Sequence, residues 1–179
     1  ADIIVGAMED DPNGDNSGAA FVVFGKKDTA AVELSAIEAG TGGFVINGAS
    51  AGDRAGVSAS ITGDVNGDGI DDVLIGAVSA DVDGISDAGS SYVVFGKKDT
   101  NTVELSAVAG GNGGFIIKGA AAGDSSGWIK SAGDVNDDGL VDMIVGSYQA
   151  DPGGVSNAGS AHVIFGKAGT TAVNLTDVN

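Results

Sequence analysis

The sequence predicts an all-β protein built from repeated antiparallel sheets, and three observations support this fold class. The chain has 179 residues, of which 32 are glycine without a Gly-X-Y period. Glycine at this density indicates many short strands joined by tight turns. Aromatic residues make up only 5% of the chain, so Val, Ile, Leu and Ala must form the core. An internal repeat of about 70 residues indicates an array of similar supersecondary units.

The repeat is clearest in two segments. Residues 22–29 (VVFGKKDT) return unchanged as residues 93–100, and residues 42–48 (GGFVING) return as residues 113–119 (GGFIIKG). Because these segments recur in the same order, the elements of one unit predict those of the next.

Each unit offers four candidate strands, which in the middle unit are residues 57–63, 72–77, 90–95 and 114–118. The second strand is a near-continuous apolar run, which is typical of a strand covered on both faces. Four-stranded antiparallel sheets that stack face to face are the blades of a β-propeller. The first strand is rich in Ala and Ser, which suits the crowded position nearest a propeller axis.

The chain contains about two and a half such blades and is therefore predicted to be an incomplete propeller. We expect a partial first blade over residues 1–56, a complete second blade over residues 57–127 and a partial third blade over residues 128–179. Residues 1–7 align with residues 71–77, so the chain begins inside a motif. Closed propellers typically have four to eight blades. We therefore expect a fragment of a longer chain, or a subunit whose neighbours complete the ring.

Long inserts separate the third and fourth strands, at residues 26–43 and 97–114. Within the second insert, residues 103–108 are expected to form a short helical turn or an added strand that covers the edge of the blade. Loops on a rigid scaffold commonly carry recognition. The inserts are therefore a candidate binding surface.

An oxygen-rich loop joins the first and second strands of two units, at residues 64–72 (DVNGDGIDD) and, 70 positions later, at residues 134–142 (DVNDDGLVD). Calcium prefers six to eight oxygen ligands. Side chains at loop positions 1, 3 and 5, the carbonyl at position 7 and the carboxylate at position 9 can surround one ion, so we predict two Ca²⁺ sites. The expected ligands are Asp64, Asn66, Asp68, the carbonyl of Ile70 and Asp72, and then Asp134, Asn136, Asp138, the carbonyl of Leu140 and Asp142.

Two other interpretations of the loops are weaker. An EF-hand would have a bidentate Glu at position 12 and flanking helices. Position 12 is instead Ile75 in one copy and Val145 in the other, both inside apolar strands. A hairpin turn rich in Asp, Asn and Gly but without metal would explain one loop. Two aligned copies with all five ligand positions intact favour calcium.

The loop and the strand after it resemble the FG-GAP repeats of integrin α-subunit propellers and of many bacterial surface proteins. The matching residues are 63–77 and 133–147. The Phe-Gly element of that family is replaced by Ala55-Gly56 in one copy and by Ser126-Gly127 in the other. The resemblance implies a seven-bladed propeller with calcium on one rim that serves in adhesion or as a scaffold, and it does not imply catalysis.

Charge and composition exclude several classes of partner. The formal net charge is −17, from 25 acidic and 8 basic side chains, whereas nucleic acids and anionic membrane surfaces attract basic proteins. The sequence has no apolar run of 18 residues, so no transmembrane segment is expected. The absence of cysteine excludes a disulfide scaffold and a zinc–thiolate site.

No catalytic residues are predicted. Ser125 lies in a Gly-x-Ser-x-Gly pattern, but that motif needs a strand–turn–helix elbow and a His partner, and the preceding unit has Arg54 at the same position. His162 is the only histidine and occupies an ordinary strand position. Trp128 begins an innermost strand and is expected to pack in the core or between blades.

These observations lead us to expect a calcium-stabilised, extracellular or cell-surface propeller that acts as a scaffold for adhesion to a protein or glycan ligand. An alternative is a structural subunit of an extracellular fibre or sheath, in which neighbouring chains complete the propeller by self-assembly. A third is a non-catalytic accessory domain of a larger secreted enzyme.

Overall fold

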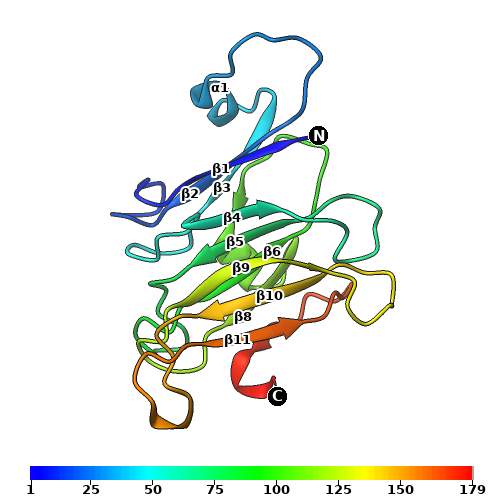
Figure 1. Ribbon diagram of the computed structural model, residues 1–179. Coiled ribbons are helices and arrows are strands. Elements are labelled where there is room, and N and C mark those ends of the chain that lie inside the picture. The colour runs from blue at the N-terminus through cyan, green and yellow to red at the C-terminus, as the bar shows by residue number, and fades with distance from the viewer. Residues whose placement is uncertain (179) are drawn as a thin grey trace.

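The structure is a computed structural model that describes residues 1–178. Its strands form three separate sheets that stack one after another along the chain, with the N-terminus beside the first sheet and the last described residues beside the third (Figure 1). Within this described part, the sheets are mainly antiparallel, which confirms the all-β prediction. None of these sheets closes on itself. The number of blades in a complete propeller stays a prediction, as do the boundaries at residues 56 and 127.

The first sheet has the order β1-β2-β3-β7, the second β12-β8-β6-β5-β4 and the third β11-β10-β9. The strands are β1 (Ile3–Ala7), β2 (Ala19–Val23), β3 (Gly43–Asn47), β4 (Ser58–Ile61), β5 (Val73–Ala77), β6 (Ser90–Val94), β7 (Val103–Glu104), β8 (Gly114–Lys118), β9 (Ser126–Gly133), β10 (Asp142–Ser147), β11 (Ser160–Ile164) and β12 (Val173–Asn174). The helical elements are α1 (Leu34–Glu38), α2 (Leu105–Ala109) and the 3₁₀ turns η1 (Pro152–Gly154) and η2 (Leu175–Asp177). The four strands expected in the middle unit are therefore β4, β5, β6 and β8.

The core lies between the sheets rather than inside any one of them. Alternate residues of β5 point to opposite sides, so Ile75 packs against the first sheet while Leu74 packs against the third. Every residue of β5 is buried. The structure thus confirms that the apolar second strand is covered on both faces, which is why it lacks the polar alternation of a half-exposed strand.

The long inserts form both of the elements considered for them. Residues of the second insert form β7 followed by α2, and β7 adds a parallel strand to the first sheet by pairing with β3. Glu104 holds this position, because its two carboxylate oxygens accept hydrogen bonds from the Asn47 and Asn13 side-chain amides, each at 2.8 Å. β12 pairs with β8 of the second sheet in the same way. Through β7 and β12, the second and third units are therefore each joined to the sheet before them.

The prediction that Trp128 is buried is wrong. Its side chain lies 47% exposed, with the ring edge-on to Tyr148 at 6.4 Å between centroids. In the stretch from residue 1 to residue 178, no helix is long and apolar enough to cross a membrane.

Candidate metal centre

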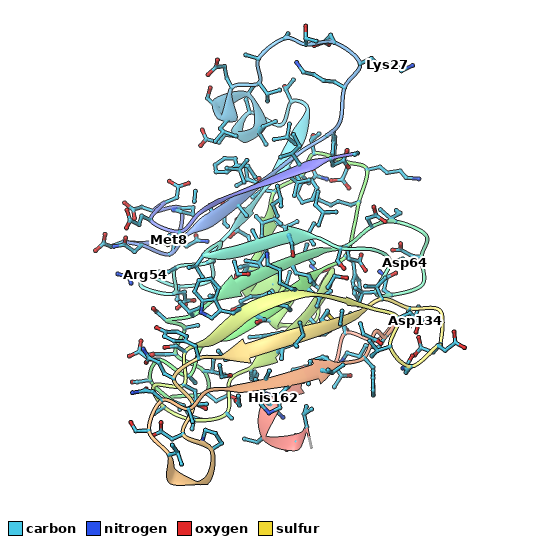
Figure 2. All side chains as sticks on the ribbon, in the orientation of Figure 1. Met8, Lys27, Arg54, Asp64, Asp134 and His162 are labelled. Carbon is cyan, nitrogen blue, oxygen red and sulfur yellow. The ribbon has the colours of Figure 1, made fainter. Side chains whose placement is uncertain are left out.

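The two oxygen-rich loops lie at the same end of the stacked sheets. One joins β4 to β5 and the other joins β9 to β10. Figure 2 shows Asp64 and Asp134 on one side of the molecule, opposite Met8 and Arg54. The backbone amide of Val141 donates to the carbonyl oxygen of Asp64 at 2.9 Å, so the second loop rests directly on the first.

The side chain at loop position 1 folds over the backbone amides of its own loop. Asp64 Oδ1 accepts hydrogen bonds from the amides of Gly67 at 2.6 Å and Asp68 at 3.1 Å, and Oδ2 accepts one from Gly69 at 2.7 Å. These bonds, that from Gly69 foremost, stabilise the ionised carboxylate and lower the pKa of Asp64. Gly69 has φ +82°, a left-handed conformation that a side chain would strain.

Positions 3 and 5 repeat the same arrangement. Asn66 Oδ1 accepts from the Asp68 amide and Asp68 Oδ1 accepts from the Ile70 amide, both at 2.8 Å. The second loop has the corresponding bonds at 2.8–3.1 Å; they join the oxygens of Asp134, Asn136 and Asp138 to the amides of Asp138, Gly139 and Leu140. The alternating oxygen-bearing residues therefore orient alike in both copies.

The carboxylate at position 9 has a role that the sequence analysis missed. Asp72 is fully buried, and its two oxygens accept from the amides of Val65 at 2.8 Å and Gly96 at 2.7 Å. Asp142 is bonded in the same way by Val135 and Gly166, each at 2.8 Å. This residue ties the loop to the end of the third strand. The signal was the constant spacing of 24 positions between this Asp and the glycine of the segment at residues 93–96 (VVFG) and of its counterpart at residues 163–166 (VIFG).

The clustered carboxylates of the first loop repel one another. Burial is the main cause that raises the pKa of Asp72 to about 6, and the negative charges of Asp68 and Asp64 raise it further. A cation bound among these oxygens would relieve both effects, because it would compensate the buried charge and attract all three carboxylates.

The predicted ligand atoms are of the kind that calcium prefers, but they are not arranged around one point as in a complete metal site. Over residues 1–178, no three His, Cys, Asp or Glu side chains are placed to hold one ion. The predicted ligands are all oxygens, as calcium prefers, and a carboxylate oxygen that accepts one hydrogen bond keeps a second lone pair for a metal. The ligand assignment for Asp64–Asp72 and Asp134–Asp142 therefore stays a prediction.

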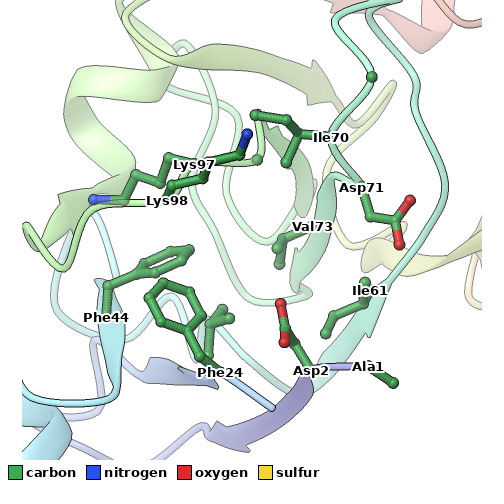
Figure 3. Close-up of a pocket in the computed structure, with 13 residues that line it drawn as sticks. Ala1, Asp2, Phe24, Phe44, Ile61, Ile70, Asp71, Val73, Lys97 and Lys98 are labelled. Atoms are coloured by element: carbon green, nitrogen blue, oxygen red, sulfur yellow. The ribbon is translucent and has the colours of Figure 1, made fainter. Parts of the chain in front are cut away.

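A cavity of about 350 Å³ lies beside the first loop, between the first two sheets. Figure 3 shows Asp2 and Asp71 on one side of it and the Phe24 and Phe44 rings on another. The ammonium of Lys97 stands 4.6 Å from the centroid of the Phe44 ring. This contact fastens the start of the second insert to the first sheet.

Ser125 and His162, which the sequence analysis considered but did not predict as catalytic residues, lie in different parts of the structure. Ser125 has φ +49° and precedes β9, so the residue is followed by a strand and not by the helix of a nucleophile elbow. His162 lies on β11, where it pairs with Val145 of β10.

Comparison with known protein families finds a match to one segment of the chain. Residues 126–164 match the FG-GAP repeat family. The match covers β9, the second oxygen-rich loop, β10 and β11, which agrees with the resemblance found in the sequence. No curated protein matches the chain.

Proposed function

We propose that this chain, whose residues 126–164 are an FG-GAP repeat, is a calcium-stabilised β-propeller-type scaffold that presents loops to a protein or glycan ligand outside the cell or at its surface. The observation that carries the proposal is the matched orientation of the oxygens at positions 1, 3 and 5 in both loops. In both loops these oxygens converge on the same short stretch of backbone, where one divalent cation could contact them.

Bound calcium would make the two oxygen-rich loops more rigid. The residues that would hold it are those predicted from the sequence, and a bound divalent cation would offset the repulsion among the loop carboxylates. Because Asp72 and Asp142 also fasten each loop to the third strand, a rigid loop would stiffen the ends of two strands at once. Metal that binds only the folded state stabilises it by mass action.

The proposed ligand contacts would lie on exposed residues of the long inserts. In the second insert, Leu105 and Val108 are buried, whereas residues such as Lys98, Asp99 and Asn101 are exposed. In the first insert, residues 26–35 are all exposed. We therefore place the proposed ligand contacts on the exposed residues of both inserts, 26–43 and 97–114.

Calorimetric titration and thermal unfolding test the calcium proposal. Calcium at 100 times its Kd adds about 2.7 kcal/mol for each site. For a domain of this size the melting temperature should then rise by about 5–10 °C for each site. We expect a stoichiometry of two ions, reduced to one by Asp68→Ala or Asp138→Ala and to none in the double variant.

Asp137→Gly is the matched control, because position 4 of the first loop is already Gly67 and is not a predicted ligand. It should retain two ions. A melting temperature that is the same in calcium and in chelator, with no heat of binding, would refute the proposal.

A further inference from the structure

The first oxygen-rich loop contains a dipeptide that the second loop lacks. Asn66 is followed by Gly67, whereas the equivalent Asn136 is followed by Asp137. An asparagine before glycine can lose its side-chain amide, because the next backbone nitrogen can attack the side-chain carbonyl carbon when no Cβ hinders the approach. Asn66 is half-buried and Gly67 is exposed, so water reaches the peptide group between them.

Hydrogen bonds within the loop hold both reacting groups of this dipeptide. Asn66 Oδ1 accepts from the amide of Asp68 at 2.8 Å. The ring closed by this bond encloses the peptide group of Gly67, and the bond polarises the carbonyl that would be attacked. The amide of Gly67 donates to Asp64 Oδ1 at 2.6 Å. The attacking nitrogen therefore lies against a carboxylate that is placed to accept its proton.

Three further asparagines precede glycine, and within residues 1–178 none of them has a carboxylate bonded to the attacking nitrogen. They are Asn13, Asn47 and Asn112. The amide of Gly48 donates to a backbone carbonyl oxygen at 2.8 Å, as the amide of Gly14 does at 3.4 Å, and a carbonyl oxygen does not take up a proton at neutral pH. Asn112 lies in an exposed turn before β8, so it shows how an asparagine in this chain reacts without such a base.

We propose that Asn66 is a self-modification site, at which Asp64 acts as the general base and Asn66 is converted to aspartate or isoaspartate. Asp64 takes the proton of the Gly67 amide while the nitrogen forms a bond to Cγ of Asn66. The proton passes to the side-chain nitrogen of Asn66, which leaves as ammonia, and a succinimide ring remains. Water then opens the ring. Attack at Cγ gives aspartate, and attack at the backbone carbonyl carbon gives isoaspartate.

Either product changes the first loop and leaves the second as it is. Aspartate would place another carboxylate among those of Asp64 and Asp68. Isoaspartate would add a methylene group to the backbone between loop positions 3 and 4, which breaks the alternation that turns positions 3 and 5 to the same side. The second loop should be stable, because the side chain of Asp137 hinders attack by its own nitrogen.

The test follows the whole chain at physiological pH and temperature, in chelator, and measures the fraction of Asn66 converted over time. Trypsin releases residues 55–97 as one peptide, in which Asn66 is the only asparagine. Liquid chromatography with mass spectrometry separates the asparagine, aspartate and isoaspartate forms of this peptide. We expect Asn66 to be converted faster than Asn112, which is the reference within the same molecule.

Two charge-matched variants test the role of the base. Asp64→Asn removes the carboxylate but keeps an oxygen that can accept the Gly67 hydrogen bond, and it should slow the conversion of Asn66 about 100-fold. Asp71→Asn removes one negative charge from an exposed residue of the same loop and should leave the rate unchanged. Circular dichroism verifies that both variants fold.

A third variant, Gly67→Asp, gives the first loop the residue that the second loop carries at this position. The second loop already holds Asp137 there at φ +61°, so the variant should fold, and Asn66 should then show no measurable conversion. Conversion of Asn66 in Asp64→Asn at the parent rate would overturn the proposal. So would an Asn112 that is converted faster than Asn66 in the parent. All samples contain chelator, so a failure here is distinct from a failure of the proposed function.

Discussion

The two oxygen-rich loops have nearly the same sequence but different surroundings. Val65 at position 2 of the first loop is fully buried, whereas Val135 at the same position of the second loop is 55% exposed. The first loop is covered by the second, which donates the Val141 amide to Asp64 and belongs to the next sheet. Nothing within residues 1–178 covers the second loop in this way. A nearly identical local sequence thus forms an enclosed loop in one unit and a more exposed loop in the next, and the difference comes from the neighbouring unit.

A charge at position 2 should show the largest contrast between the loops. Val65→Asp places an uncompensated carboxylate in the core between the second and third sheets, where it should cost about 3–5 kcal/mol of unfolding free energy. Val135→Asp lies at the surface and should change stability by no more than about 0.5 kcal/mol. Urea unfolding in chelator measures both. Equal losses would show that the two loops are enclosed alike.

A second contrast is between Asp53 and Asp124, which lie in successive connections between sheets. It predicts how the free energy of unfolding depends on pH. Asp53 is 7% exposed, and burial raises its pKa from 3.8 to about 6. Because the folded protein binds this proton more tightly than the unfolded chain does, the contribution of Asp53 favours folding below about pH 4 and is lost as the pH rises through 6. Asp53→Asn removes this loss and should be more stable than the parent by about 2 kcal/mol at pH 7.5.

Asp124→Asn is the matched variant in the next connection. Burial raises the pKa of Asp124 as well, but its side chain is only partly buried, so the gain should be smaller. Denaturant unfolding at pH 4 and pH 7.5, in chelator, measures the gain in stability of each variant over the parent. A pH dependence of Asp53→Asn equal to that of the parent would contradict the assignment.

The smallest contrast concerns the lysines that begin the inserts. Lys97 forms an ion pair with Asp99 at 2.8 Å and also stands over the Phe44 ring. Lys26 has the equivalent pair with Asp28 at 2.9 Å, but over the described residues no ring lies beneath it. Lys97→Met should therefore cost about 0.5–1 kcal/mol more than Lys26→Met, which is the size of a cation–π contact. Urea unfolding of the two variants would show no difference if the ring contributed nothing.

Much of the local structure could be predicted because it depends on short-range patterns. The apolar run of β5 predicted a strand buried on both faces, and the positions of β4, β6 and β8 followed from the repeat. The oxygen-bearing residues of the two loops could be named because alternate positions of a tight loop turn to the same side. Gly69 and Gly139, with φ +82° and +89°, form the matching turn in each loop.

The remaining features depend on which unit lies next to which. The parallel pairing of β7 with β3 joins residues about 57 positions apart, as from Ile46 to Val103, and no local pattern encodes that pairing. The exposure of Trp128 and the enclosure of Val65 have the same origin. By itself, the sequence determined the repeated strand-and-loop unit, because hydrophobic pattern and turn chemistry act over a few residues. Only the tertiary structure decided which neighbouring unit covers each face and edge, because those contacts form between residues far apart in the sequence.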